Sequence, residues 1–197
     1  MQSQHIYLIC SHISQKFLIC VYIYPFFCYN IYTMDKIKTN AIRIAEKNKI
    51  SYKIHHYECD EFKDGLEIAE KIGMPKEKVF KTLVTVGKSK NYNVFVIPVE
   101  CELDMKLAAK AVGEKNVEMI AVKDINAVTG YIRGGCTPVG MKKKYKTVID
   151  KSCENFETII VSAGRIGDMM ELPTKGLIAL ADAKTDDIVK GTKINEF

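Results

Sequence analysis

One lysine stands inside an otherwise apolar stretch of the chain. Lys81 lies between Phe80 and Thr82 within residues 79–86, whose apolar character predicts a strand. A buried ammonium group is costly unless it is paired or faces a cavity, where it can stabilise an anion, a carbonyl or a phosphate. The alternative is a lysine at a strand entrance whose amino group reaches water, and the pattern by itself favours this second interpretation.

A glycine-rich segment is the second candidate for a binding site. Residues 129–140 contain four glycines and one proline, which predicts a long ordered loop. Glycines let a backbone approach a ligand closely and present N–H groups to an oxyanion or a phosphate. The segment lacks the Lys-Ser/Thr pair of a P-loop and does not open a helix as a dinucleotide fingerprint would. A purely structural series of turns is equally compatible with it.

Three other groups of residues carry weaker signals. Residues 162–167 follow a predicted strand and form either the edge of a site or a simple turn, without the Gly-x-Ser-x-Gly pattern of a nucleophile elbow. His55 and His56 are neighbours in a predicted strand and should face opposite sides, so they do not form a ready metal pair. The basic run 142–144, with Lys146, fits either a solvated surface or a contact with a phosphate backbone.

The cysteines and the net charge limit the class of protein. Seven cysteines are scattered along the chain, with no CxxC pair and no Cys/His cluster of zinc-finger spacing. This distribution predicts a reducing, cytoplasmic environment and no metal site. Nothing marks a base beside Cys101, so a buried thiol is favoured over a nucleophile. The formal charge of +5 permits a polyanionic partner, although a solvated surface with a small lysine excess is the simpler explanation.

The first 33 residues differ in composition from the rest. They contain no Asp or Glu, and Lys16 is their only Lys or Arg. Their best apolar run, residues 17–29, is shorter than a membrane-spanning helix needs and is interrupted by Pro25. We expect residues 1–33 to lie outside the fold, with a true start at Met34 favoured over a membrane anchor or a signal peptide. Residues 34–197 are then expected to form one domain.

The domain combines helices and strands without strict alternation. Strands are expected at residues 52–57, 79–86, 93–99, 117–121, 147–150 and 158–162. Helices are expected at residues 38–47, 64–72, 104–112 and 173–181, with a short helical turn after Pro75, a brief helix at 124–128 and a terminal turn at 186–189. This arrangement predicts an α+β, or mixed α/β, single domain with a central mixed sheet flanked by helices.

Several of these stretches together resemble the YbaK/EbsC family, also called the prolyl-tRNA-synthetase-associated domain. The most specific part is Thr129-Gly130-Tyr131 followed by Gly134-Gly135, Pro138 and Gly140. Further similarity is carried by segments 38–41, 52–58, 79–83, 103–106, 115–118, 147–150, 162–167 and 171–172. Each motif is weak alone, but their order and spacing are specific, and they cover residues from about 38 to 189. Within the family, the chain is most similar to bacterial Cys-tRNA(Pro) deacylases.

The resemblance implies an activity and a set of roles. Such enzymes hydrolyse wrongly charged tRNA, because a synthetase pocket cannot fully separate amino acids of similar size. Lys81 would be the catalytic residue, stabilising developing negative charge, and the substrate's own thiol would attack its ester carbonyl. No metal or cofactor is implied. The expected partners are the acceptor end of mischarged tRNA and, as a second candidate, prolyl-tRNA synthetase, with neither DNA nor a membrane. The substrate would contact Tyr57, Thr82, Tyr131, Gly134 and Ser162.

One departure from the family pattern leaves the substrate open. The family often has an acidic or amide residue seven positions after the serine that matches Ser162, where this chain has Met169. Either Asp168, one position earlier, replaces that contact through a local shift, or the contact is missing. Deacylation of another mischarged tRNA, such as Ala-tRNA(Pro) or Ser-tRNA, therefore stays open, as does a non-catalytic module that binds tRNA or a synthetase.

Overall fold

The structure is a computed structural model that describes residues 38–58 and 64–190. The chain divides into two units after Lys38, and the fold below is that of the second unit, from Thr39 onward. The prediction for residues 1–33 concerns residues outside this described part and stays a prediction. Within the described ranges, no helix has the length and apolar character needed to cross a membrane.

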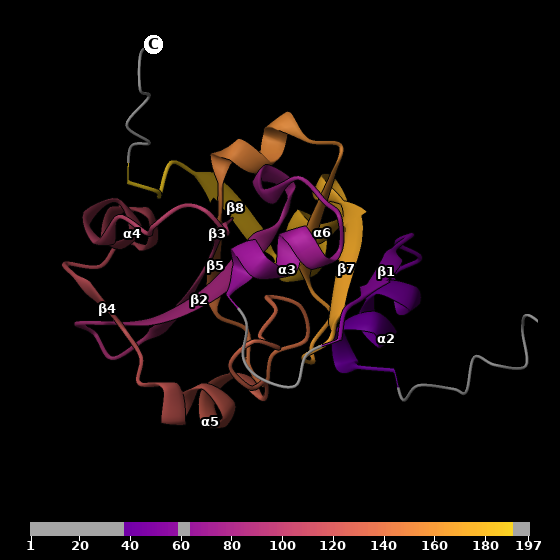
Figure 1. The fold of residues 1–197 in the computed structure, drawn as a ribbon. Helices are drawn as coiled ribbons and strands as arrows, with labels where there is room; N and C mark the ends of the chain where they lie inside the picture. The colour runs from indigo at the N-terminus through magenta and orange to yellow at the C-terminus, as the bar shows by residue number, and fades with distance from the viewer. Residues whose placement is uncertain (1–37, 59–63, 191–197) are drawn as a thin grey trace, which may run out of the picture. The chain divides into compact units, whose positions relative to one another are not determined.

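Two β-sheets form the frame of the domain (Figure 1). The larger sheet is mixed: the order is β4-β2-β3-β5-β8, antiparallel from β4 to β3 and parallel from β3 to β8. Its strands are β2 Phe80–Gly87, β3 Tyr92–Pro98, β4 Val117–Met119, β5 Lys146–Asp150 and β8 Ala183–Asp186. The smaller sheet is antiparallel, with β7 in the middle, and consists of β1 Lys53–His56, β6 Thr158–Ser162 and β7 Asp168–Pro173.

The helices begin and end where the sequence supplies caps. The α-helices are α2 Asn40–Lys47, α3 Gly65–Lys71, α4 Met105–Val112, α5 Ile125–Thr129 and α6 Thr174–Ala181. Single-turn helices occur at η2 Lys76–Lys78, η3 Val122–Asp124 and η4 Lys151–Asn155. The Asp104 carboxylate accepts from the backbone N–H groups of Lys106 and Leu107 at the start of α4. Gly113 closes the same helix with a φ of 72°, a conformation that costs glycine little.

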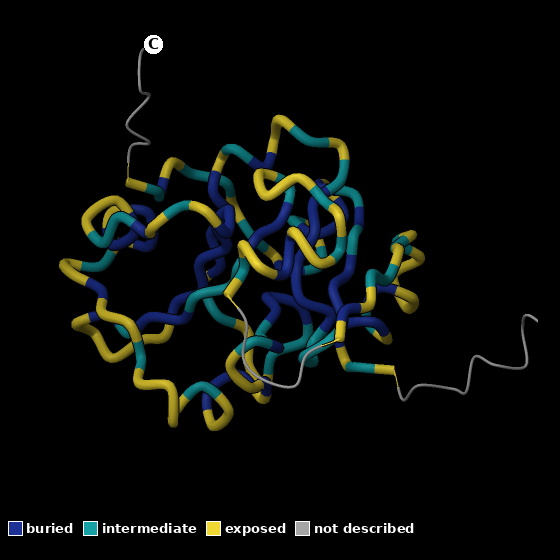
Figure 2. Tube along the Cα trace, in the orientation of Figure 1, coloured by how far each residue is buried: buried dark blue, intermediate teal, exposed yellow. Residues whose placement is uncertain are grey.

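The main core lies between the two sheets and helices α2 and α6. Strands β2 and β3 contribute Phe80 and Val96, while β6 and β7 contribute residues such as Val161 and Met170, all at most 1% exposed. Figure 2 shows this buried core running through the strands, with exposed residues on the helices and turns. The opposite face of the larger sheet packs against α4, which supplies a second apolar cluster. Because both faces of β3 are covered, it is apolar along most of its length.

The two sheets meet at one point that positions the site. An isolated parallel bridge joins Val79, just before β2, to Ile160 in β6. Two residues beyond the bridge on each strand lie Lys81 and Ser162, so the bridge brings these two positions near each other.

The structure confirms most of the predicted elements and the mixed α/β class. The β2–β3 pair lies in the middle of the larger sheet, and residues 130–140 form an irregular loop, as expected. Strands β7 and β8 were not predicted, and the terminal turn expected at 186–189 is wrong. That segment instead follows β8, and Val189 forms an antiparallel bridge with Leu103. Strand β8 pairs with β5, far earlier in the chain, whereas β7 pairs with its hairpin neighbour β6 and with the distant β1. Neither strand has a long apolar run of its own.

Candidate active site

A pocket of about 560 Å³ opens beside the junction of the two sheets. Its floor comes from β2, with Ser162 of β6 and Met169 of β7 at one side. The start of α3, the segment from β4 to α5 and the glycine loop complete its walls. Its size falls within the range of small-molecule sites, and most of its lining is apolar, as such sites require.

Lys81 lies in this pocket and is partly shielded from water. Its ammonium nitrogen Nζ donates a hydrogen bond to the carbonyl oxygen of Val99, 2.9 Å away. Burial lowers the pKa of Lys81 below its ordinary value of 10.5, because desolvation penalises the charged form, and the nearby Cys101, Glu102 and Asp64 partly oppose this shift. The amino group is thus a poorly hydrated positive charge facing a cavity, which suits the stabilisation of an anionic oxygen.

Three further predicted residues lie beside Lys81 in the pocket lining. They are Thr82, Gly134 and Ser162. The Thr82 hydroxyl oxygen Oγ1 is buried and has no hydrogen-bond partner within the described part of the chain, so it can pair with a bound ligand. The Ser162 hydroxyl oxygen accepts a hydrogen bond from the backbone N–H of Gly164 at 3.3 Å. Gly134 has a φ of 83° and presents backbone to the pocket without a side chain.

The glycine loop is fastened to the domain at several points. The Tyr131 hydroxyl donates to the carbonyl of Val139 at 2.7 Å, and the Asn40 amide donates to the carbonyl of Gly140 at 2.7 Å. At Gly135 the loop backbone touches the turn after β6 so closely that a Cβ would lie 2.9 Å from the Cα of Arg165. The residues of this loop that reach the pocket are therefore held in place by backbone and buried contacts.

Two of the predicted substrate contacts, Tyr131 and Tyr57, lie outside the pocket lining. Tyr131 is 8% exposed and supports the loop from behind, and burial raises its pKa to about 12. Tyr57 is also 8% exposed and packs in an apolar cluster with Val79 and Met169. The structure gives both tyrosines a supporting position behind residues that line the pocket, and their direct contact with substrate stays a prediction.

Asp168 is placed away from the pocket as well. Its carboxylate, on a side chain only 4% exposed, lies 2.5 Å from His56 Nδ1 and also accepts from the Arg165 guanidinium. Met169, the next residue, lines the pocket in its place. Asp168 is thus engaged in pairs within the smaller sheet and the turn after β6, and its predicted role as a substrate contact stays a prediction.

The weaker sequence candidates have structural partners elsewhere. His55 Nε2 lies 2.8 Å from Glu171 Oε2 across the β1–β7 pair, on the other face from His56 as expected. Burial is the main cause that raises the pKa of the Cys101 thiol above its ordinary value, which disfavours a thiolate nucleophile. In the basic run, Lys142 donates to the carbonyl of Asn126 at 2.9 Å, so part of the run stabilises the fold.

Several pocket residues were not predicted from the sequence. Arg133 and Cys136 both line the pocket from the glycine loop, as does Asp64 from the start of α3. The two loop residues could have been found, because they lie within the segment that its glycines had already marked. Burial raises the pKa of Cys136 to about 11, so its thiol stays protonated near neutral pH. In the described ranges, no group of three or more His, Cys, Asp or Glu side chains is arranged to hold a metal ion.

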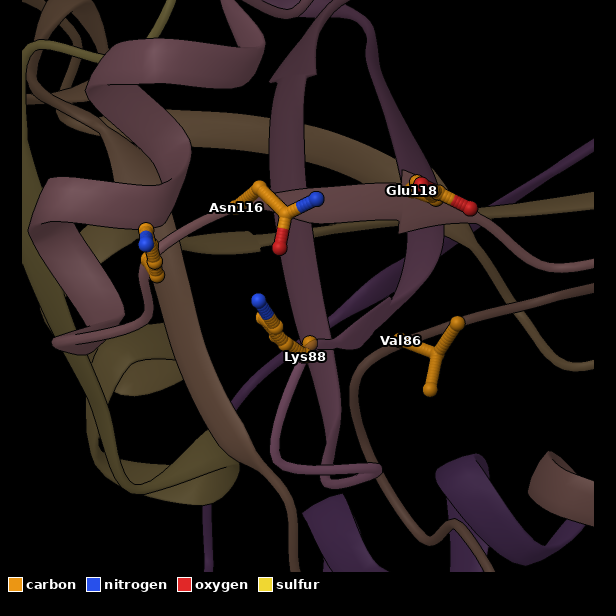
Figure 3. Close-up of a pocket in the computed structure, with 6 residues that line it drawn as sticks. Val86, Lys88, Asn116 and Glu118 are labelled. Carbon is orange, nitrogen blue, oxygen red and sulfur yellow. The ribbon is translucent and has the colours of Figure 1, made fainter.

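A smaller hollow of about 380 Å³ lies at the far end of β2 (Figure 3). Its polar lining residues are Lys88, Lys115, Asn116 and Glu118, which are all exposed. Its polar groups are open to solvent, so it lacks the shielding from water that strengthens charge interactions in a site. The pocket around Lys81 is the better candidate, because it alone among the described pockets combines a half-buried cation with an unpaired buried hydroxyl.

Known proteins resemble this chain in sequence and in fold. The family model for the aminoacyl-tRNA editing domain matches residues 60–180, which include every residue that lines the pocket. The chain belongs to the aminoacyl-tRNA editing family. A relative from Enterococcus faecalis (strain ATCC 700802 / V583) is 44% identical over 152 residues, covering 77% of this chain and 93% of the relative. That protein carries the provisional name Cys-tRNA(Pro)/Cys-tRNA(Cys) deacylase EbsC.

Solved structures share the editing-family fold at lower identity. A protein described provisionally as a trans-editing enzyme for prolyl tRNA synthetase matches with a TM-score of 0.67 and 21% identity, over 77% of this chain and 98% of its own. A hypothetical protein matches with a TM-score of 0.71 and 18% identity, over 77% of this chain and all of its own. At these identities the likeness establishes the fold and leaves the chemistry to the site itself.

Proposed function

We propose that this member of the aminoacyl-tRNA editing family is a trans-acting deacylase that hydrolyses cysteine from tRNA(Pro). The observation that carries the proposal is Lys81, a poorly hydrated cation in a pocket of about 560 Å³. The name of the Enterococcus relative, which is 44% identical over most of both chains, supports the same substrate. A separate editing site is needed because cysteine and proline are too similar in size for a synthetase pocket to exclude one completely.

Lys81 would act on the ester carbonyl oxygen. In this reaction the sulfur of the substrate cysteine attacks its own ester carbon, the C–O bond to the ribose breaks, and the thiol proton passes to the ribose oxygen. The resulting thiolactone is then opened by water to free cysteine. Negative charge develops on the carbonyl oxygen during the attack, and a fixed, desolvated ammonium group stabilises that charge better than water does. Because attack within one molecule gains from proximity, positioning the substrate is a large part of catalysis.

The residues around the pocket fit a reaction in which the protein supplies no nucleophile. The Cys136 thiol is protonated near neutral pH, since burial raises its pKa to about 11. The Ser162 hydroxyl accepts from a backbone N–H, and no histidine of the described ranges lines the pocket to serve as its base. His55 and His56 instead lie beside Glu171 and Asp168. A serine or cysteine mechanism would need a base within hydrogen-bond reach of the nucleophile.

The proposal is tested by the rates at which the full chain hydrolyses a set of charged tRNA(Pro) molecules. We expect rapid release of cysteine and slow release of alanine and proline. Blocking the thiol, as in S-methylcysteinyl-tRNA(Pro), should reduce release to the uncatalysed rate, because the internal attack is lost. Rapid release of alanine with no release of cysteine would replace the proposed substrate, and equal rates for cysteine and S-methylcysteine would overturn the proposed chemistry.

A further inference from the structure

Two cations line the pocket, and they differ in exposure. Lys81 is partly buried, with its ammonium group bonded to the Val99 carbonyl, whereas Arg133 is exposed. Exposure places Arg133 at the opening and Lys81 further inside. An exposed guanidinium and a desolvated ammonium serve different purposes: the first can capture an anion from solution, and the second stabilises charge that develops in a dry site.

The one carboxylate that lines the described pocket does not cancel these charges fully. Asp64 caps α3 and accepts hydrogen bonds from the backbone N–H groups of Leu66 at 2.9 Å and Glu67 at 3.0 Å. Its charge is partly satisfied by this helix start. Among the described residues that line the pocket, two cations stand against this one carboxylate, which favours an anionic part of the ligand over a neutral one.

Arg133 stands on a backbone that is fixed at both sides. Gly135 N–H donates to the carbonyl of Ile132 at 3.0 Å, which closes a tight turn around Arg133 and Gly134. Tyr131, just before the turn, is anchored by its hydroxyl to the Val139 carbonyl, and Gly135 packs on the Arg165 backbone. The anchored turn fixes the backbone from which the Arg133 side chain extends, and a guanidinium can make a planar, two-point contact with an oxyanion such as phosphate.

The surface at the opening also matches one nucleotide. Leu66, Met119 and Val122 line the pocket with exposed fractions of 40%, 48% and 56%. Large apolar side chains that gather at a pocket opening mark a binding surface, and the face of a base is a suitable occupant. An apolar rim with one cation on it corresponds to the base and the phosphate of a nucleotide.

We propose that Arg133 binds the phosphate that links the last nucleotide of the substrate tRNA to the one before it, and so holds the aminoacyl ester over Lys81. The inference rests on the proposed deacylase function, which it deepens by assigning the two cations separate tasks. Arg133 provides affinity for the acceptor end, and Lys81 provides the chemical step. Arg133 is in this sense a substrate-binding residue whose loss affects KM rather than kcat.

A pair of non-hydrolysable probes measures the phosphate contact without turnover. The two probes are 3′-cysteinylamino-adenosine with and without a 5′-phosphate, bound to the full chain and followed by calorimetry. The wild type should bind the phosphorylated probe roughly ten- to hundredfold more tightly, as for a charge-assisted hydrogen bond. Arg133→Ala should abolish this difference and leave the affinity for the phosphate-free probe unchanged. Arg133→Lys should restore part of the difference, since lysine keeps the charge without the planar fork.

Turnover provides the second measurement and its control. With Cys-tRNA(Pro), Arg133→Ala should raise KM roughly ten- to hundredfold, change kcat little, and flatten the salt dependence of binding by about one phosphate contact. Lys110→Ala, which removes an exposed charge from α4 outside the pocket, should leave KM unchanged. Equal loss of affinity for both probes, or no loss for either, would overturn the role of Arg133. If the wild type discriminates between the probes but releases no cysteine, the proposed deacylase function is rejected while the phosphate contact of Arg133 stands.

Discussion

At the scale of single residues, the proposed site centres on Lys81, whose charged form is disfavoured by its partly buried position. The pKa of Lys81 is lower in the native chain than in the unfolded chain, so the native state penalises the charged form. That penalty is fully present below the lowered pKa and disappears as pH rises towards 10.5. At neutral pH the charged Lys81 therefore lowers the stability of the native state, a cost that active-site groups often carry.

The sequence showed which lysine to single out but could not show why it matters. An apolar strand that carries one lysine occurs both at ordinary strand ends and at sites. The distinction lies in the pocket beside β2, which is formed by segments far from Lys81 in sequence. For the same reason Tyr131 could be marked as a residue near the site, while its position behind the loop could not be foreseen.

We predict that Tyr131→Phe weakens the glycine loop. The substitution keeps the ring and removes the hydroxyl that donates to the Val139 carbonyl at 2.7 Å. Losing this buried hydrogen bond should lower the free energy of unfolding by about 1–2 kcal/mol and reduce deacylation, because the loop carries Gly134 and Arg133. Chemical denaturation and kinetics measure the two effects. Tyr92→Phe, on an exposed ring at 37%, is the control and should change neither; equal effects of the two substitutions would contradict the supporting role of Tyr131.

At the scale of elements, local signals were sufficient wherever a cap or an apolar run was present. Thr39, Asp64 and Asp104 were each expected at or near a helix start, and each side chain accepts backbone N–H bonds there. Strand β7 was missed because its ends carry Asp168 and Pro173, which do not favour a strand on propensity alone. Strand β7 is held by pairing on both sides: β6 adjoins it through the short turn at 163–167, and β1 lies far earlier in the chain. The pairing with β1 cannot be seen in the local sequence.

We predict that the close contact between the glycine loop and the turn after β6 does not tolerate a side chain at Gly135. Gly135→Ala would place a Cβ 2.9 Å from the Arg165 Cα and 3.1 Å from its carbonyl carbon. Backbone atoms cannot yield as a side chain can, so the loop should move, with a loss of about 1–3 kcal/mol in the free energy of unfolding and a large loss of deacylation.

Gly73→Ala is the matched comparison, because Gly73 has a positive φ of 65° but open space around its Cβ position. It should destabilise the chain by about 1–2 kcal/mol through backbone strain and leave deacylation by the folded protein intact. If Gly135→Ala kept full activity, the close packing of the loop would not be what shapes the pocket.

The β1–β7 pair should make the fold sensitive to acid. The hydrogen bond with His55 is the main cause that lowers the pKa of Glu171 below its ordinary 4.5. A lowered carboxyl pKa adds stability that is present above 4.5 and is lost as pH falls through the native value. Glu171→Gln should therefore reduce stability near pH 6 and flatten its decline below pH 4.5, measured by urea denaturation at each pH. An unchanged decline would assign the acid sensitivity to other carboxylates.

At the scale of the whole domain, the site arises where two sheets meet and then separate. The bridge between Val79 and Ile160 aligns β2 with β6, and the pocket forms just beyond it. Its walls come from segments between residues 64 and 169, so no single stretch of sequence contains the site. The order of motifs along the chain was nevertheless enough to indicate the family, because a shared fold brings the same segments together.

The cations behind the net charge of +5 have different structural positions, which composition alone cannot distinguish. Lys142 and Lys146 donate to backbone carbonyls and stabilise loops and helix ends, whereas Lys81 and Arg133 line the pocket. A total charge indicates that an anionic partner is possible. Only the positions of individual cations indicate where such a partner would bind.

The most direct test of the account is the single-turnover deacylation of Cys-tRNA(Pro) by the full wild-type chain and by Lys81→Ala. We predict a loss of about a hundredfold or more in the rate of the chemical step, as for removal of one group that stabilises an oxyanion. The melting temperature of the variant should be unchanged or higher, since the substitution removes a desolvated charge. A Lys81→Ala protein that releases cysteine as fast as an active wild type would contradict the central role of Lys81.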